Sequence, residues 1–402
     1  MERAISLLGL AVFVGLSYAF SANRRAVRWP PVLWGIALQL ILALLIIRTD
    51  AGFRAFKFLG DVMTGFLDFS DAGAKFVFGD NFAEHFIAFK VLPTIIFFSA
   101  FITVMYHYGI LQQAVRGVAW VMLKTMKTSG AETLSCASNI FLGPTESPLL
   151  IKPYVATMTQ SELHSVMTAG FGTIAGGVMA AYLSFGVPAS HLIAASVMSA
   201  PASMAISKLL YPETEEPLTA GKMDVEMKTA YSNAIDAAAA GASEGMRLAL
   251  NVAAMLIAFL GLLAFVNALL GWAGAQVGLP QLSLEWLLSF LMAPVAWLMG
   301  VPFADCGQVA VLLGKKTILN EFIAYLDLKK LIDAQAISER AAIIATYALC
   351  GFANIGSIGI TIGGIGGMVP ERQHDLARLG VRAMVAGALA NFMTACIAGM
   401  LL

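Results

Sequence analysis

Long apolar segments bounded by polar residues alternate along most of the chain. Near-continuous apolar runs cover residues 4–20, 32–47, 91–106 and 253–270. At 1.5 Å per residue, helices of about this length cross a hydrocarbon core roughly 30 Å thick. The pattern therefore predicts an all-α protein with several membrane-spanning helices.

Two segments depart from this pattern. Residues 51–82 mix charged residues with phenylalanines, which is typical of amphipathic helices lying at a membrane surface. Residues 212–228 replace the apolar pattern with charge and proline, and they divide the chain into two membrane halves. We expect a linker there.

The composition agrees with a membrane protein and excludes other classes. Hydrophobic residues make up 59% of the chain and charged residues 12%, about half the share in a typical soluble domain. The net charge is zero and no long basic tract is present, so no nucleic acid polymer is expected as partner. Neither the histidines nor the serines form a metalloprotease or hydrolase motif, so the sequence gives no indication of an enzyme.

One short apolar stretch, FLGPTESPLL at residues 141–150, contains both a helix breaker and a carboxylate. A helix starting near Gly130 is too short to cross the bilayer before Gly143-Pro144, and proline cannot continue it. The chain is therefore predicted to turn back as a re-entrant hairpin with Glu146 at its tip. A carboxylate facing lipid would cost about 2.5–3.5 kcal/mol, so Glu146 is expected to face a functional site.

A second hairpin is predicted from residues 304–313 and 318–328, with its turn at residues 314–317. Again a carboxylate, Glu321, follows the break. The alternative for both glutamates is a structural ion pair, Glu146 with Lys152 or Glu321 with Lys316.

Each half also contains a glycine-rich segment, at residues 170–177 and 351–364, and GFGTIA in the first resembles GFANIG in the second. Paired interrupted segments in two halves are typical of transporters whose site lies at the membrane midplane. Unwinding would free carbonyl oxygens beside Asn139 and Thr173, a suitable cage for a cation. Asn354 and Ser357 can share a face toward a polar solute. The alternatives are a chance match and glycines that serve only close helix packing.

Charge and capping patterns add orientation. Ser129 with Glu132, and Thr159 with Glu162, have the spacing of capping boxes that begin helices. Basic residues follow the first apolar run and precede the last, namely Arg24, Arg25, Arg28, Arg372, Arg378 and Arg382. These loops are expected to be cytoplasmic, so both termini would be periplasmic. Four lysines oppose this topology: Lys315, Lys316, Lys329 and Lys330.

Taken together, five motifs in fixed order closely resemble the concentrative nucleoside transporters: GPTESPLL, GFGTIAGGV, GVPFADC, NEFIAY and CGFANIGSIGI. The resemblance covers nearly the whole chain and suggests a bacterial member. It implies a homotrimer in the inner membrane with eight transmembrane helices, two re-entrant hairpins, interfacial helices and an inverted repeat. A scaffold would hold a mobile transport domain that imports nucleosides by an elevator-type movement.

The resemblance also implies a division of the chain and a set of site residues. Residues 1–129 would form the N-terminal scaffold, 130–211 the first repeat, 212–228 a cytoplasmic linker, 229–282 a scaffold span, and 283–402 the second repeat. The base would meet Gly143, Pro144, Thr145 and Glu146, between apolar walls Val178 and Phe352. The ribose would bind Glu321, Asn354 and Ser357. Sodium would bind Asn139, Thr173 and the main-chain oxygens of Leu142 and Ile174.

Several alternatives stay open. The family usually has glutamine where this chain has Pro144, which leaves the preference for purine or pyrimidine undecided. A proton carried by Glu146 could replace sodium, and no other cofactor is expected. A carrier of another small solute, such as a free nucleobase, would use the same kind of site. An intramembrane enzyme would need a nucleophile or a metal, and a channel would need a ring of charges or carbonyls.

Overall fold

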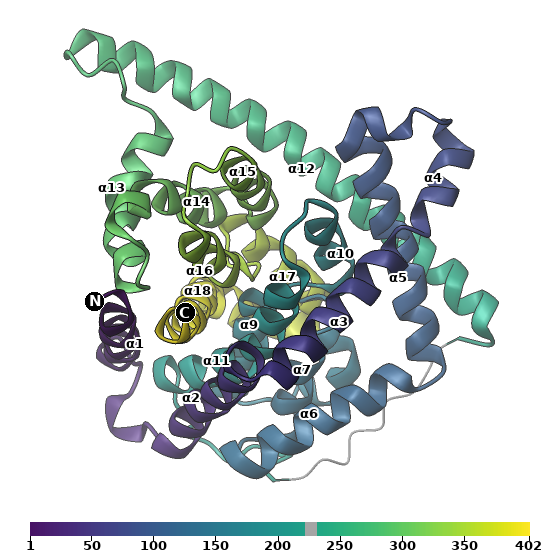
Figure 1. Cartoon of the computed structure of the whole chain (residues 1–402). Coiled ribbons are helices and arrows are strands. Elements are labelled where there is room, and N and C mark those ends of the chain that lie inside the picture. The colour runs from purple at the N-terminus through teal and green to yellow at the C-terminus, as the bar shows by residue number, and fades with distance from the viewer. Residues whose placement is uncertain (222–230) are drawn as a thin grey trace.

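A computed structural model describes residues 1–221 and 231–402, so the last part of the predicted linker, residues 222–228, lies outside the described residues. Every longer element in the described part is a helix (Figure 1). One isolated β-bridge joins Ser129 to Ala220. The predicted all-α class is confirmed.

The part before the first hairpin contains two apolar helices, two amphipathic helices and two further helices. In chain order they are α1 (Glu2–Ala19), α2 (Trp29–Ala43), α3 (Asp50–Leu67), α4 (Ser70–Phe78), α5 (Leu92–His107) and α6 (Ile110–Met126). A π-helical turn, Leu44–Arg48, lengthens α2. Helices α3 and α4 correspond to the segment predicted to be interfacial.

The two halves of the remaining chain each contain a hairpin followed by a broken helix and a long helix. The first has α7 (Gly130–Ser138), a 3-10 turn (Ser147–Ile151), α8 (Lys152–Val155), α9 (Gln160–Gly172), α10 (Gly176–Ser184) and α11 (Ala189–Leu210). The second has α14 (Cys306–Ile318), α15 (Glu321–Asp333), α16 (Glu339–Leu349), α17 (Ile355–Met368) and α18 (Gln373–Leu401). Between the halves lie α12 (Ala234–Gln276) and α13 (Leu284–Leu298).

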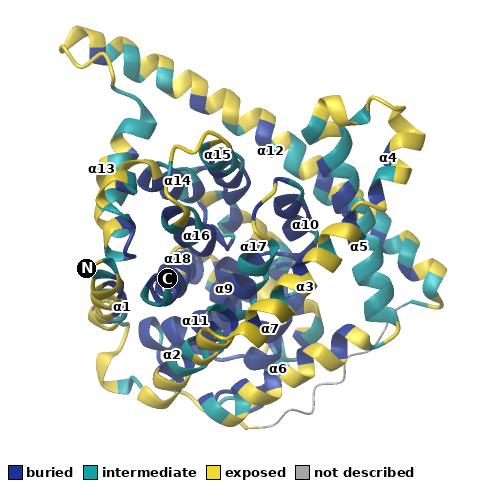
Figure 2. Cartoon of the chain, in the orientation of Figure 1, coloured by how far each residue is buried: buried dark blue, intermediate teal, exposed yellow. Residues whose placement is uncertain are grey.

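The described residues contain seven helices long and apolar enough to span a membrane. The resemblance implies eight transmembrane helices, and two further apolar helices, α13 and α17, are shorter. Helices α9, α11 and α18 form the buried centre of the molecule (Figure 2). In α12, by contrast, only 17% of its apolar 18-residue stretch is buried. The long, exposed α12 is thus suited to contact lipid or other chains.

Both termini lie on the same side of the molecule (Figure 1). A guanidinium nitrogen of Arg3 donates to the main-chain oxygen of Leu402 at 2.6 Å. At the other end of α1, Arg382 within α18 donates to the Phe20 oxygen at 2.8 Å. The prediction that the termini share a side agrees with this geometry.

The predicted turn of the second hairpin was wrong. Residues 314–317 belong to α14, and the chain breaks at Leu319 and Asn320 instead. Gly314 is a packing glycine, because a Cβ there would lie 2.6 Å from the Cβ of Leu288. Asn320 begins α15 by accepting a hydrogen bond from the Ile323 amide at 3.0 Å. The glutamate therefore follows the true break at once.

Candidate substrate and cation site

The tip of the first hairpin is an irregular turn between α7 and the 3-10 turn that follows it. The Gly143 amide donates to Oε2 of Glu146 at 3.1 Å, so the carboxylate satisfies a main-chain group that proline and the turn leave free. Glu146 is half-buried, and among the described residues no ion pair joins it to Lys152. The structural ion pair considered for Glu146 is absent from this geometry.

Asn139 caps the C-terminal end of α7 and is fully buried. Its Nδ2 donates to the Ser135 oxygen at 3.0 Å. Its Oδ1 is buried and has no hydrogen-bond partner in the described structure. A buried amide oxygen without a partner costs free energy unless a donor or a cation occupies the space before it. Asn139 thus has the chemistry of a cation ligand.

The other expected cation ligands lie where α9 gives way to α10. Helix α9 ends at Gly172, and Thr173 is extended, with φ −120° and ψ 171°. The amide of Gly176 donates to the Phe141 oxygen at 3.0 Å, which holds this break against the hairpin tip. Asn139, Leu142, Thr173 and Ile174 therefore lie in two neighbouring non-helical segments, and all four are buried. No cluster of three or more His, Cys, Asp or Glu that could hold a metal is found in the described residues.

The second half of the site centres on Glu321, the first residue of α15. The Tyr182 hydroxyl donates to its Oε1 at 2.9 Å, and Asn354 Nδ2 donates to its Oε2 at 3.0 Å. Asn354 Oδ1 in turn accepts from the Ser357 amide at 2.8 Å and begins α17. The structure brings the three predicted ribose ligands together. It does not pair Glu321 with Lys316, which bonds elsewhere.

Each hairpin also contacts the broken helix of the other half. A Cβ on Gly364 of α17 would lie 2.3 Å from the Thr145 side chain, so the first tip packs against α17. Tyr182 of α10 reaches Glu321 in the second hairpin, and Val178 lies buried one turn before it on α10. The Phe352 amide donates to the Thr173 oxygen at 3.2 Å, joining the two breaks.

Unwinding is more limited than expected from the glycines. It covers residues 173–175 and 350–354, whereas the glycines of α17 are helical. Several glycines serve close packing, as in the alternative considered above: a Cβ on Gly170 would lie 2.8 Å from Pro144 Cβ. Pro144 itself is half-buried against α9.

Sequence reasoning missed Tyr182 and Asn391. Tyr182 lies in an apolar helix and carries no motif. Asn391, in α18, donates to the main-chain oxygens of Gly172 and Cys350 at 2.6 Å each. Neither residue gives a local signal, because each acts on partners far away in sequence.

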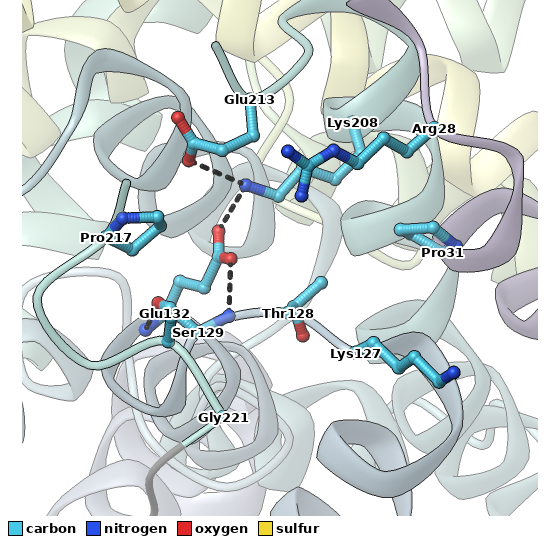
Figure 3. Close-up of a pocket in the computed structure, with 11 residues that line it drawn as sticks. Arg28, Pro31, Lys127, Thr128, Ser129, Glu132, Lys208, Glu213, Pro217 and Gly221 are labelled. Carbon is cyan, nitrogen blue, oxygen red and sulfur yellow. Dashed lines mark hydrogen bonds and ion pairs between the residues drawn. The ribbon is translucent and has the colours of Figure 1, made fainter. Parts of the chain in front are cut away.

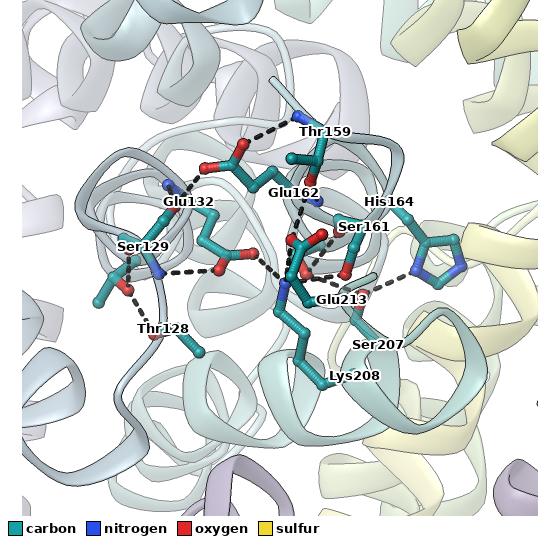
Figure 4. Close-up of polar contacts among 12 residues, drawn as sticks. Thr128, Ser129, Glu132, Thr159, Ser161, Glu162, His164, Ser207, Lys208 and Glu213 are labelled. Atoms are coloured by element: carbon teal, nitrogen blue, oxygen red, sulfur yellow. Dashed lines mark hydrogen bonds and ion pairs between the residues drawn. The ribbon is translucent and has the colours of Figure 1, made fainter. Parts of the chain in front are cut away.

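A second buried polar cluster lies at the base of the first hairpin, away from the tip. Both predicted capping boxes are confirmed there, at Ser129 with Glu132 and at Thr159 with Glu162. Lys208, near the end of α11, pairs with Glu132 at 2.7 Å and Glu213 at 3.6 Å (Figure 4).

Further contacts enclose this cluster. Ser129 also donates to Glu162, and Lys208 donates to Ser161 at 2.9 Å. Beside it lies a cavity of about 80 Å³, lined also by Arg28 and Lys127 (Figure 3). The positive charge of Lys208 is neutralised by carboxylates of the protein itself. We therefore interpret this cluster as a structural contact that joins α7, α9 and α11.

Residues 191–399 match the family described as "Na+ dependent nucleoside transporter C-terminus", residues 8–81 the corresponding N-terminus, and residues 88–189 a region described as "Nucleoside recognition". The chain belongs to this family of nucleoside transporters. The family is one of carriers, in agreement with the absence of enzyme motifs.

Individual relatives support the family membership. Solute carrier family 28 member 3 of Homo sapiens is 50% identical over all of this chain, which spans 60% of the relative's length. Sodium/nucleoside cotransporter 1 of Homo sapiens is 48% identical, again over all of this chain and 64% of the relative.

Solved structures of CNTnw match over nearly their full length. The inward-facing, substrate-bound state has 38% identity and a TM-score of 0.94, covering all of this chain and 98% of that one. A variant in an outward-facing state has a TM-score of 0.95, with the same identity and coverage. The fold found here is thus one observed in both states.

Proposed function

We propose that the protein is a secondary active transporter that imports nucleosides across a membrane together with sodium. The observation that carries the proposal is the buried pair formed by Glu321 and Asn354, together with the buried Asn139 oxygen that has no hydrogen-bond partner in the described structure. The family description, the sodium/nucleoside cotransporters among its relatives and the substrate-bound CNTnw structure support it.

The ribose is the part of the substrate that the second half suits best. The Glu321 carboxylate and the Asn354 amide are hydrogen-bonded to each other at 3.0 Å, so together they can bind both hydroxyls of a ribose. Ser357 lies beside Asn354. Without those hydroxyls, buried polar groups would lose their partners, and such mismatches can reject a substrate strongly. A free base should therefore bind poorly. The tip residues 143–146, with Val178 and Phe352, would meet the base.

Sodium is the coupling ion that the first half suits best. Hard cations prefer oxygen ligands, and Asn139 Oδ1, the Thr173 hydroxyl and the main-chain oxygens of Leu142 and Ile174 supply only oxygens. The competing ion is a proton on Glu146, whose carboxylate already accepts from the Gly143 amide. Sodium coupling predicts uptake driven by a sodium gradient, whereas proton coupling predicts uptake driven by a proton gradient.

Movement and assembly complete the proposal. Residues 130–211 and 283–402 would move as a transport domain against a scaffold of residues 1–129 and 229–282. The CNTnw states, which include outward-facing, intermediate and inward-facing forms, support alternating access. We propose a homotrimer in which the exposed apolar face of α12 contributes to the contacts between copies. A bacterial inner membrane with periplasmic termini is the proposed location.

The test is uptake by proteoliposomes of labelled uridine, adenosine and uracil under imposed sodium or proton gradients. We expect uridine and adenosine to accumulate only with inward sodium, and uracil to remain outside. Uracil uptake equal to uridine uptake would favour a nucleobase carrier. Uptake driven by the proton gradient alone would mean that the coupling ion is a proton carried by Glu146 and not sodium.

Trimer assembly can be checked on the same preparation. Native mass spectrometry in detergent should give the mass of three chains. A monomer that transports at full rate would contradict the assembly without affecting the substrate proposal.

A further inference from the structure

A buried lysine without a carboxylate lies beside the second half of the site. Lys316, in the last turn of α14, is 1% exposed, and among the described residues no ion pair involves it. Its Nζ donates to the Ala348 oxygen and to Asn391 Oδ1, at 2.8 Å each. Such a cation is costly to bury unless it is well bonded and meets negative potential. Its partners show where that potential comes from.

Ala348 is next to the last residue of α16, and the C-terminal end of a helix carries a partial negative charge. Lys316 therefore places a fixed positive charge at this helix end. The last turn of α9 has no such lysine bonded to it in the described contacts, and it leads directly into the proposed sodium ligands. Helix α16 thus ends at the fixed cation of Lys316, and α9 ends at the proposed site of an exchangeable sodium ion.

Asn391 joins the two ends. With its Oδ1 held by Lys316, its Nδ2 donates to the oxygens of both Gly172 and Cys350. Gly172 is the last residue of α9, one position before Thr173. Cys350 follows α16 directly, two positions before Phe352 and four before Asn354. A single side chain thereby fixes the start of both non-helical segments.

The packing around this amide leaves little room for independent movement. A Cβ on Gly351 would lie 2.4 Å from Asn391 Oδ1, and one on Gly387 would lie 2.5 Å from Phe171 Cβ. The Phe352 amide also donates to the Thr173 oxygen. A shift of the main chain at Thr173 is therefore passed to the segment carrying Phe352 and Asn354.

We propose that Asn391, held in place by Lys316, is a positioning residue that couples occupancy of the cation site at Thr173 to the affinity of the nucleoside site at Asn354. Asn391 bonds to Lys316, Gly172 and Cys350, and none of these is a proposed ligand residue. When a cation draws the residue 173–174 oxygens into place, the shared amide holds residues 350–354 in the arrangement that binds ribose. The inference rests on the proposed sodium-coupled function.

The test measures uridine affinity of the purified full chain over a sodium titration, with choline as replacement. In the unmodified protein, sodium should increase the affinity. Asn391→Leu removes both donors, and Asn391→Asp keeps an acceptor for Lys316 but presents no amide donor to the two carbonyls. In both variants we expect the sodium-induced gain to fall by roughly fivefold or more, as expected for the loss of two neutral hydrogen bonds.

Gln39→Leu is the matched control, because Gln39 is also a fully buried amide but bonds to Gly35 and Thr394 instead. Its sodium-induced gain should equal that of the unmodified protein. A merely structural role of Asn391 would lower thermal stability or weaken binding equally with and without sodium. An unchanged gain in Asn391→Leu would therefore overturn the inference.

If Asn391→Leu does not fold, Asn391→Asp decides the matter by the same criterion. A gain absent already from the unmodified protein has a different meaning. It would contradict the proposed sodium coupling itself, so the two failures can be told apart.

Discussion

The two halves of the site use corresponding residues in opposite ways. Asn139 lies 31 residues before Gly170, and Asn320 lies 31 residues before Gly351, so the same spacing separates each asparagine from its glycine-rich motif. Asn139 ends α7 and leaves its Oδ1 unbonded. Asn320 begins α15, and its Oδ1 accepts from the Ile323 amide.

The buried lysines differ between the halves as well. In the first half Lys208, near the end of α11, is paired with carboxylates at the hairpin base. In the second half Lys316 pairs with none and bonds at a helix end. The first half therefore has an amide oxygen without a partner, Asn139 Oδ1, that is available to a mobile cation. In the second half the corresponding oxygen, Asn320 Oδ1, is hydrogen-bonded, and the ammonium group of Lys316 is a fixed cation. We therefore propose that one sequence pattern has been adapted to two tasks, an ion site in the first half and a sugar site in the second.

The largest expected effect concerns the sugar half. Glu321→Gln should nearly abolish nucleoside uptake while leaving assembly intact, because a neutral amide is a weaker acceptor for ribose hydroxyls than a carboxylate. It would also lose an acceptor for Tyr182 or Asn354. Uridine uptake and binding are the measurements. Glu339→Gln, the same change at an exposed position of α16, is the control, and normal uridine affinity in Glu321→Gln would exclude the ribose role.

The lysines give the next effect, on stability. Lys208→Met leaves Glu132 buried without its cation, and breaking a buried pair in this way costs about 3–5 kcal/mol. Lys316→Met breaks hydrogen bonds to Ala348 and Asn391 but no ion pair among the described residues, so it should lower the melting temperature in detergent less than Lys208→Met does. Equal losses for the two variants would remove the distinction drawn between them.

How far the sequence predicts this arrangement depends on how local the cause is. The first hairpin could be predicted because Gly143-Pro144 stops a helix through its own backbone chemistry, and the two capping boxes are local motifs as well. The second break has no proline. It depends on Asn320 capping α15, while the packing of Gly314 against Leu288 allows α14 to continue past the glycine.

The contacts that no local pattern predicts are long-range ones. Tyr182 and Glu321 are 139 residues apart, and Asn391 and Gly172 are 219 apart. Lys316 was considered only as a partner of the nearby Glu321, whereas its bonded asparagine lies 75 residues away. These choices are made by tertiary packing. A family resemblance suggests site residues, but it does not reveal which side chains hold them.

The ion half gives the third prediction. Asn139→Ala should raise the sodium concentration needed for half-maximal uptake much more than it lowers transport at saturating sodium, since it removes one oxygen from a cage of few ligands. Thr173→Ala should act likewise. Asn320→Ala is the matched control at the corresponding position: it loses a helix cap, costing about 1 kcal/mol of stability, without a change in sodium dependence. If Asn139→Ala and the unmodified protein have the same sodium dependence, Asn139 is not a sodium ligand, and a proton becomes the favoured coupling ion.

The smallest expected effect concerns the base, at Pro144, where the resemblance leads us to expect a glutamine. Proline has no side-chain donor or acceptor, so the base can be read here only through Thr145, Glu146 and bridging water, which adapts to either pattern of donors and acceptors. Pro144→Gln should therefore shift the ratio of pyrimidine to purine uptake, and a neutral hydrogen bond of about 0.5–1.5 kcal/mol limits the shift to roughly three- to tenfold. Competition of uridine, cytidine, adenosine and inosine against labelled uridine measures it. Because the Pro144 ring also packs against Gly170, Pro144→Ala controls for lost packing, and it should lower uptake of all four nucleosides alike. Identical competition profiles for Pro144→Gln and the unmodified protein would mean that position 144 serves only the contact with α9, and that base selection lies with the remaining tip residues.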